Sequence, residues 1–226
     1  MIPSRPSPRR SRRAVAAALL ALSVLAGGTA FAASLTVTSS KLTGWSSATS
    51  VVCTPSTATA SADADSYADQ DNASSNFGSS PILKVRAQLP VLGIGGNSRA
   101  LVRFTLPPTP DLCSVTLAKL RLYASSSDSG RTLQALRVNA SWVESGTGSV
   151  TWNNQPATTG TAVTTSSGTG YREWTVTSQV TSMYSGSNNG FLVRDSAESP
   201  ALGSPEQQFN SRTAAGNQPE LVITFG

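Results

Sequence analysis

The chain has 226 residues, with 17 Lys or Arg, 12 Asp or Glu and no histidine. The absence of histidine excludes Ser-His-Asp and Cys-His nucleophile activation, histidine general bases and histidine-ligated zinc. The formal charge of +5 originates before residue 33, where five of the 17 basic residues and no acid lie, so that 12 basic and 12 acidic residues remain. A balanced chain without a basic cluster predicts no nucleic-acid partner.

The first 32 residues have the pattern of a secretory signal peptide. Arginines precede a small, apolar run from Ala14 to Ala26, and the segment ends in Ala30-Phe31-Ala32. A basic start, a short apolar centre and an A-x-A end predict export with cleavage after Ala32. The pair Arg12-Arg13 leaves twin-arginine export open beside general secretion, which is the better match. The run is too short to cross a bilayer, so we expect a secreted, extracellular protein without a membrane span.

Residues 33–60 are rich in Ser, Thr and Ala and are predicted to form an N-terminal arm or linker. The exported chain has two cysteines, Cys53 and Cys113, and an even count in an oxidising compartment favours one disulfide. The alternative is a pair of buried free thiols. A disulfide would join the arm to the start of a central strand.

From residue 61 to residue 226 the sequence predicts a single β-domain. Short apolar runs alternate with polar residues and end at Gly, Ser, Asn, Asp or Pro. The only helical segment expected is about one turn near Val176–Tyr184. About eight to ten short antiparallel strands without helices indicate an all-β jelly-roll β-sandwich. The expected strands include Ser66–Ala68, Ile82–Ala87, Arg99–Leu106, Ala118–Ala124, Thr132–Val138, Tyr171–Val176, Gly190–Arg194 and Glu220–Phe225.

The segment Ala140–Pro156 combines two tryptophans, one acid and a polar Gly-rich loop. Trp142 follows an alternating strand, which favours packing in the core. Glu144 is expected to hydrogen-bond to the Thr151–Asn153 backbone and hold the loop. The same cluster of aromatic and amide groups is also typical of a ligand platform, so both interpretations stay open here.

Several motifs resemble the DNRLRE-type domain, a family also described as a carbohydrate-binding module found in alginate lyases. Asp65-Ser66-Tyr67 and Asn76-Phe77-Gly78 match its D-x-Y and N-[YF]-G opening, and Ala118–Tyr123 matches A-x-L-x-L-Y. Trp142-Val143-Glu144 and Val150–Pro156 match its W-x-E and v-T-W-N-n-q-P element. The fold signature comprises Tyr67, Asn76, Phe77, Gly78, Trp142, Glu144, Trp152 and Pro156.

The resemblance covers Ser61–Gly226 and implies a secreted jelly-roll module of the kind attached to polysaccharide-active enzymes. The chain departs from the family pattern at two places. It has Thr175-Val176-Thr177 where Asp-Val-Thr is common, and Ser211-Arg212-Thr213 where Ser-Arg-Glu is common. Each departure removes an acid, and with it any ion pair or cation site that this acid would form.

Sugars stack their C–H faces on aromatic rings and exchange hydrogen bonds with amides, carboxylates and guanidinium groups. Trp152, Asn153, Asn154 and Tyr123 are therefore the candidate ligand-binding residues. Each also has a structural interpretation: Trp152 can pack inward, the two asparagines suit a turn, and Tyr123 can be an ordinary residue of a solvent-exposed sheet face.

The acidic run that begins at Asp63 and Asp65 is the second candidate site. Calcium takes six to eight hard oxygen ligands, and these two acids are candidate ligands for a structural Ca²⁺. The spacing lacks the glycine and terminal glutamate of an EF-hand. A solvated strand edge with like charges is the alternative.

Together these features predict a secreted, non-catalytic, monomeric module that binds extracellular polysaccharide or cell-wall glycan. Two carboxylates could still hydrolyse a glycoside, but most acids flank turn residues, where solvated surface or calcium ligation is commoner. The alternative function is a structural or cell-surface interaction protein with no glycan ligand.

Overall fold

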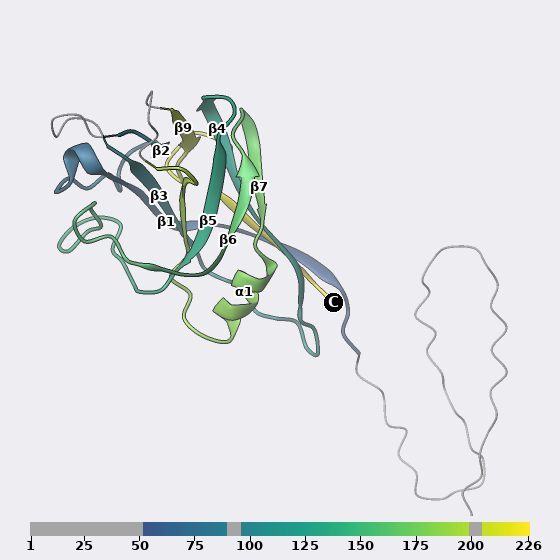
Figure 1. Cartoon of the computed structure of the whole chain (residues 1–226). Helices are drawn as coiled ribbons and strands as arrows, with labels where there is room; N and C mark the ends of the chain where they lie inside the picture. Colours follow the sequence, from purple (N-terminus) through teal and green to yellow (C-terminus); the bar gives the residue numbers. More distant parts are fainter. Residues whose placement is uncertain (1–51, 90–95, 199–204) are drawn as a thin grey trace, which may run out of the picture. The chain divides into compact units, whose positions relative to one another are not determined.

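The computed structural model describes residues 52–89, 96–198 and 205–226 (Figure 1). The predicted signal peptide (1–32) and most of the predicted arm (33–60) lie outside these residues. All pairings between the strands are antiparallel, which confirms the all-β prediction. The described residues form ten strands: β1 (Ser56–Asp69), β2 (Ile82–Arg86), β3 (Ser98–Phe104), β4 (Val115–Ser127), β5 (Thr132–Val138), β6 (Thr158–Ser166), β7 (Gly170–Thr175), β8 (Phe191–Asp195), β9 (Glu206–Asn210) and β10 (Glu220–Phe225).

The long strand β1 closes the strands into a sandwich-like barrel. Its first half, Ser56–Ser61, pairs with β10, and its second half, from Ala62 to Asp69, pairs with β3. The strand order is β1-β10-β4-β9-β2-β3-β8-β5-β6, and β7 pairs with β4. One wall therefore contains β1, β10, β4 and β7, and another contains β1, β3, β8, β5 and β6.

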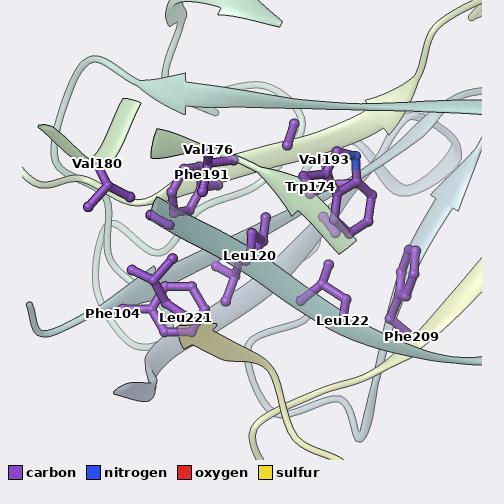
Figure 2. Close-up of a cluster of buried hydrophobic side chains, with 14 of the residues drawn as sticks. Phe104, Leu120, Leu122, Trp174, Val176, Val180, Phe191, Val193, Phe209 and Leu221 are labelled. Atoms are coloured by element: carbon purple, nitrogen blue, oxygen red, sulfur yellow. The ribbon is translucent and has the colours of Figure 1, made fainter. Parts of the chain in front are cut away.

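The main hydrophobic core lies between these walls (Figure 2). Alternation places Leu120 and Leu122 of β4 inward, as the sequence predicts, together with Val102 and Phe104 of β3. Trp174 is fully buried, and its indole nitrogen donates a hydrogen bond to the Leu133 carbonyl at 3.1 Å. Each such large apolar side chain contributes about 1.5–3 kcal/mol by leaving water, so this cluster dominates the stability of the domain.

Because of a β-bulge in β1, the small residues before and after it face different apolar cores. The register with β3 shifts between Ala62 and Ala64, which leaves Asp63 unpaired. Ala62 packs against the main core, whereas Ala64 and Ala68 belong to a second cluster. A single extra residue has this effect because successive strand residues point to opposite faces. The second cluster comprises Ala64, Ala68, Leu101, Leu136, Val138, Trp142, Val150 and Leu192.

Helix α1 (Thr177–Tyr184) lies where the sequence predicts a helical segment, but it has eight residues rather than one turn. It lies toward one end of the strands (Figure 1) and buries Val180 and Met183 against the main core. The buried Gln179 amide donates to the carbonyls of Ala135 and Thr161, which attaches the helix to β5 and the edge strand β6. A short 3-10 turn, η1 (Gln70–Asn72), follows β1.

The predicted disulfide is present: Cys53 and Cys113 are joined, with their Cα atoms 4.8 Å apart. It closes a loop with a sequence separation of 60, which stabilises the fold by about 4 kcal/mol in the chain-entropy model. Strand β1 begins at Ser56, whereas composition placed the start of the domain at residue 61. Residues 56–60 belong to the sheet because they pair with β10 and because Ala58 and Ala60 pack on the core.

Two strands have no counterpart among those named from the sequence. Strand β6 has a glycine in a run of threonines, and β9 has only Phe209 as a large apolar residue. Both lack the apolar alternation that identifies a strand. Hydrogen bonds from neighbouring strands hold both extended. Strand β6 pairs with β5, and β9 pairs with β2 and β4.

Candidate functional site

The segment Ala140–Pro156 covers the outer face of the β1-β3-β8-β5 wall. Trp142 is buried at 6% exposure, and its indole nitrogen donates to the Asn189 carbonyl at 2.9 Å. With Val150 it completes the second apolar cluster, against Leu101 of β3 and Leu192 of β8. This burial agrees with the core interpretation of Trp142.

Glu144 connects this segment to two distant parts of the chain. Its carboxylate accepts two hydrogen bonds from the Arg212 guanidinium, each 2.5 Å long, and one from the Asp65 backbone N–H at 2.9 Å. The Asp65 carboxylate in turn accepts from the Arg212 backbone N–H at 2.6 Å. The prediction that Glu144 bonds to the backbone of Thr151–Asn153 is wrong. The fold brings Arg212 and β1 to its carboxylate instead. We call Asp65, Glu144 and Arg212 the acid–arginine latch.

The latch shifts the pKa values of its two acids in opposite directions. Burial raises the pKa of Asp65 to about 7, and the negative charge of Glu144 also raises it. The hydrogen bond from the Arg212 backbone lowers this pKa but does not offset the rise. Burial also raises the pKa of Glu144, but hydrogen bonds from Arg212 and from the Asp65 backbone outweigh it and hold that pKa below its ordinary value. The environment of the latch therefore favours a charged Glu144 and a readily protonated Asp65.

Other signature residues also contact the Ala140–Pro156 segment or pack beside it. The Asn76 amide donates to the carbonyls of Glu144 and Val150 at 2.9 and 2.7 Å. Gly78 lies so close that a Cβ atom there would be 2.1 Å from the Glu144 carbonyl oxygen. The rings of Tyr67 and Phe77 stack with centroids 4.2 Å apart. Tyr67, Asn76, Phe77, Gly78, Trp142 and Glu144 are thus gathered by their contacts into one region of packing and hydrogen bonding.

Trp152, Asn153 and Asn154 make contacts mainly within the chain. The Arg99 guanidinium lies 4.6 Å from the centre of the half-buried Trp152 ring, which also packs on the second cluster. The Asn153 amide donates to the Ser74 hydroxyl at 3.1 Å. The Asn154 side-chain oxygen accepts from the Thr151 backbone and hydroxyl, and its amide donates to the Ser149 carbonyl. Most of the recognition groups that the sequence suggests here are engaged in shaping the loop.

Of the two candidate calcium ligands, Asp63 lies in the bulge and Asp65 lies after it, and they face different partners. Exposed Asp63 accepts from Arg103 and Thr105, both at 2.8 Å. Asp65 is 1% exposed and belongs to the latch. Among the described residues there is no group of three or more His, Cys, Asp or Glu placed to hold a metal ion. A cation at Asp63 would have to compete with the guanidinium of Arg103.

Tyr123 lies on the other wall, with side chains that the β4–β7 register brings together. Tyr123 is opposite Tyr171, Arg121 is opposite Glu173, and these odd-numbered β4 residues point away from the core. The two tyrosine rings meet edge to face with centroids 5.3 Å apart, and both are half-buried. The Arg121 guanidinium lies 4.2 Å from the centre of the Tyr171 ring. We call Lys119, Arg121, Tyr123, Tyr171, Glu173 and Glu220 the tyrosine face.

Charges on the tyrosine face alternate across the strands. Glu173 binds Lys119 at 2.8 Å and Arg121 at 2.9 Å, and Arg121 also binds Glu220 of β10 at 2.5 Å. These cations hold the pKa of Glu173 below its ordinary value through hydrogen bonds and charge. Burial and the negative Glu220 raise the pKa of Tyr171, so its hydroxyl stays protonated at neutral pH. The result is a polar surface across β10, β4 and β7 that includes two half-buried rings.

Sequence reasoning selected Tyr123 but not the group around it. The signal was present in part: alternation along Ala118–Ala124 and Tyr171–Val176 predicts which residues share a face. The register of β4 against β7 and β10 is not readable from the sequence. Trp152 and Tyr123, proposed together as ligand contacts, belong to different walls and form two separate surfaces.

A shallow cavity of about 290 Å³ beside the disulfide is lined by Cys113, Val115, Tyr184 and neighbouring residues. It is small for a ligand pocket, for which about 300–1,000 Å³ is usual, and it holds none of the candidate residues. The helices of the described residues are all too short or too polar to cross a membrane.

The fold is an all-β module with a buried apolar core and half-buried aromatic rings on two surfaces. The model of carbohydrate-binding module family 96 matches residues 56–225, and the chain belongs to this family. The match confirms the resemblance to a carbohydrate-binding module, whereas the DNRLRE-type label stays a prediction. No curated protein matches the sequence.

Proposed function

We propose that this protein is a secreted, non-catalytic jelly-roll module that binds extracellular polysaccharide through the tyrosine face. The observation that carries the proposal is the pair of half-buried rings, Tyr123 and Tyr171, on a sheet surface beside charged groups. Their neighbours Arg121 and Glu173 can exchange hydrogen bonds with sugar hydroxyls. Membership of a carbohydrate-binding family supports the same function.

The contacts of the Ala140–Pro156 segment support a structural role rather than sugar recognition. The carboxylate of Glu144 is 14% exposed and bound to Arg212, and the half-buried Trp152 ring packs on the second apolar cluster. By contrast, the side chains of Lys119 and Glu173 are 40% and 38% exposed, so that a ligand can reach them. The tyrosine face extends across the three neighbouring strands β10, β4 and β7, which suits an extended polymer.

Secretion and the absence of catalysis are supported by separate observations. The disulfide suits an oxidising compartment, because thiols stay reduced in the cytosol. The acid Glu173 of the tyrosine face binds Lys119 and Arg121, which hold its pKa below its ordinary value, whereas a general acid needs a raised pKa. Structural Ca²⁺ is not required by this proposal.

Affinity electrophoresis in gels that contain single polysaccharides tests the function. We expect retardation by at least one polymer, and loss of at least about tenfold in affinity for Tyr123→Ala and Tyr171→Ala, which is about 1.4 kcal/mol. Asn153→Ala, on the other surface, is the matched control and should keep its affinity. Retardation lost in Asn153→Ala but kept in Tyr123→Ala would move the site to the loop. Unchanged mobility across a broad panel would contradict glycan binding and favour a structural, cell-surface role, which co-sedimentation with purified cell wall would then reveal.

A further inference from the structure

Glu220 belongs to the tyrosine face but comes from a third strand, β10. The antiparallel registers place Glu220 opposite Arg121 of β4, and Arg121 opposite Glu173 of β7. Opposite residues of neighbouring strands lie side by side on one face of a sheet. An acid therefore lies on each side of Arg121, and the surroundings of the two acids differ.

Glu220 is the closer and better shielded of the two acids that bind Arg121. The side chains of Glu220 and Arg121 are 29% and 28% exposed, whereas that of Glu173 is 38% exposed. The Glu220 carboxylate accepts a hydrogen bond from the Arg121 guanidinium at 2.5 Å. Glu173 accepts one from Arg121 at 2.9 Å and another from Lys119. Glu220 is thus the stronger anchor of Arg121.

Arg121 connects this anchor to the two tyrosine rings. The carbon of its guanidinium group lies 4.2 Å from the centre of the Tyr171 ring, which is a cation–π contact. The Tyr171 ring meets the Tyr123 ring edge to face, with centroids 5.3 Å apart. A continuous series of contacts therefore runs from Glu220 on β10 through Arg121 to both rings.

Glu220 also interacts with the hydroxyl group of Tyr171. Burial raises the pKa of Tyr171, and Glu220 raises it further through its negative charge and as an acceptor of a hydrogen bond from the tyrosine hydroxyl. The charge of Arg121 lowers this pKa. The Tyr171 side chain is therefore held at two places, by Arg121 at its ring and by Glu220 at its hydroxyl.

We propose that Glu220 is a positioning residue of the tyrosine face, which fixes Arg121 and, through it, the Tyr171 ring where a polysaccharide stacks. The inference rests on the proposed function and adds a residue that acts without touching the ligand. A side chain that is already ordered loses less conformational freedom on binding. Removing the restraint should therefore weaken binding even though the stacking ring is still present.

Glu220→Asp tests this role at constant charge, because it keeps the carboxylate and shortens the side chain by one methylene group. In affinity electrophoresis with a polymer that retards the wild-type chain, we expect an about three- to tenfold loss of affinity, the range expected when one side chain must be ordered on binding. Combining Glu220→Asp with Tyr171→Ala should weaken binding no further than Tyr171→Ala alone, because the two residues act as a unit. Glu206→Asp on β9, outside the tyrosine face, is the matched control and should keep the wild-type affinity.

Titration of Tyr171 without a ligand gives a second readout, which a general loss of stability would not change. The NMR signal of the ¹³C-labelled tyrosine ring, assigned with Tyr171→Phe, reports its pKa. We expect this pKa to lie above the ordinary 10 in the wild-type chain and closer to 10 in Glu220→Asp. Glu206→Asp should titrate like the wild-type chain.

The outcomes distinguish the inference from the proposed function. If Glu220→Asp keeps the wild-type affinity while Tyr171→Ala loses it, the inference is overturned and the proposed function stands. Losses that add in the double variant, or a Tyr171 pKa that Glu220→Asp leaves unchanged, would also overturn the inference. Absence of binding to every polymer would contradict both the inference and the proposed function.

Discussion

The sharpest stability test of this structure is Glu144→Gln in the acid–arginine latch. Glutamine has almost the same shape, but it removes the negative charge and turns one acceptor into a donor that faces the Arg212 guanidinium. Two charge-assisted hydrogen bonds of 2.5 Å are affected, and the Arg212 charge loses its partner. The substitution therefore isolates the electrostatic contribution of the latch from its packing.

The magnitude follows from the exposure of the pair. Glu144 is 14% exposed and Arg212 is 36% exposed. Breaking a fully buried pair costs about 3–5 kcal/mol, whereas an exposed pair is worth about 0–1 kcal/mol. For this intermediate pair we expect a loss of about 2 kcal/mol in the free energy of unfolding. In a domain of this length that lowers Tm by about 4–8 °C.

Thermal unfolding followed by far-UV circular dichroism at pH 7 measures the effect, with the disulfide kept oxidised. Glu173→Gln is the matched control, because it makes the same chemical change in an exposed ion pair at 38% exposure. It should lower Tm by less than about 3 °C. If Glu144→Gln unfolds at the same temperature as Glu173→Gln, the latch contributes no more than a surface ion pair and the reasoning fails.

Three further predictions concern the same framework. Asp65→Asn should leave Tm unchanged near pH 4 and raise it near pH 8. The pKa of Asp65 in the folded domain, about 7, lies above the ordinary 3.8, so the wild-type domain loses up to about 4 kcal/mol of stability as pH rises between these values. An equal shift of Tm at both pH values would contradict this. Gly78→Ala should lower the free energy of unfolding in urea by about 3 kcal/mol, because the new Cβ would meet the Glu144 carbonyl oxygen at 2.1 Å. Gly216→Ala, where a new Cβ would have no atom within 4 Å, should change it by less than about 1 kcal/mol. Similar urea midpoints for the two variants would refute the close approach at Gly78. The double substitution Cys53→Ser with Cys113→Ser should lower the free energy of unfolding by about 4 kcal/mol, to the value of the wild-type chain under reducing conditions. A reduced wild-type chain as stable as the oxidised one would show that the disulfide does not constrain the domain.

Much of the fold could be predicted from the sequence because it depends on local patterns. The alternation along Ala118–Ala124 identifies β4 and its inward face, and the sequence also predicts the position of helix α1, though not its length. The disulfide could be predicted because the sequence contains only one possible pair. Strands β6 and β9 could not be predicted in this way, since the hydrogen bonds that hold them come from strands distant in the sequence.

The candidate site was less predictable than the fold. The signature motifs indicated which residues matter, but their contacts join residues far apart in sequence, such as Glu144 and Arg212 or Asp65 and Arg212. The bulge at Asp63 shifts the alternation of β1 by one residue, and the sequence pattern does not reveal it. Only the tertiary structure shows that Asp63 is exposed and Asp65 buried.

The sequence by itself determined the all-β class, the single cross-link, the core-facing positions of the main strands and the balance of charge after residue 32. These properties depend on residue type and on spacing along the chain. Only the tertiary structure decided that the Ala140–Pro156 segment covers a second core, and that Tyr123 meets Tyr171, Arg121 and Glu173 on the opposite wall. The physical reason is that strand register and wall closure are set by the packing of whole faces, which no local pattern encodes.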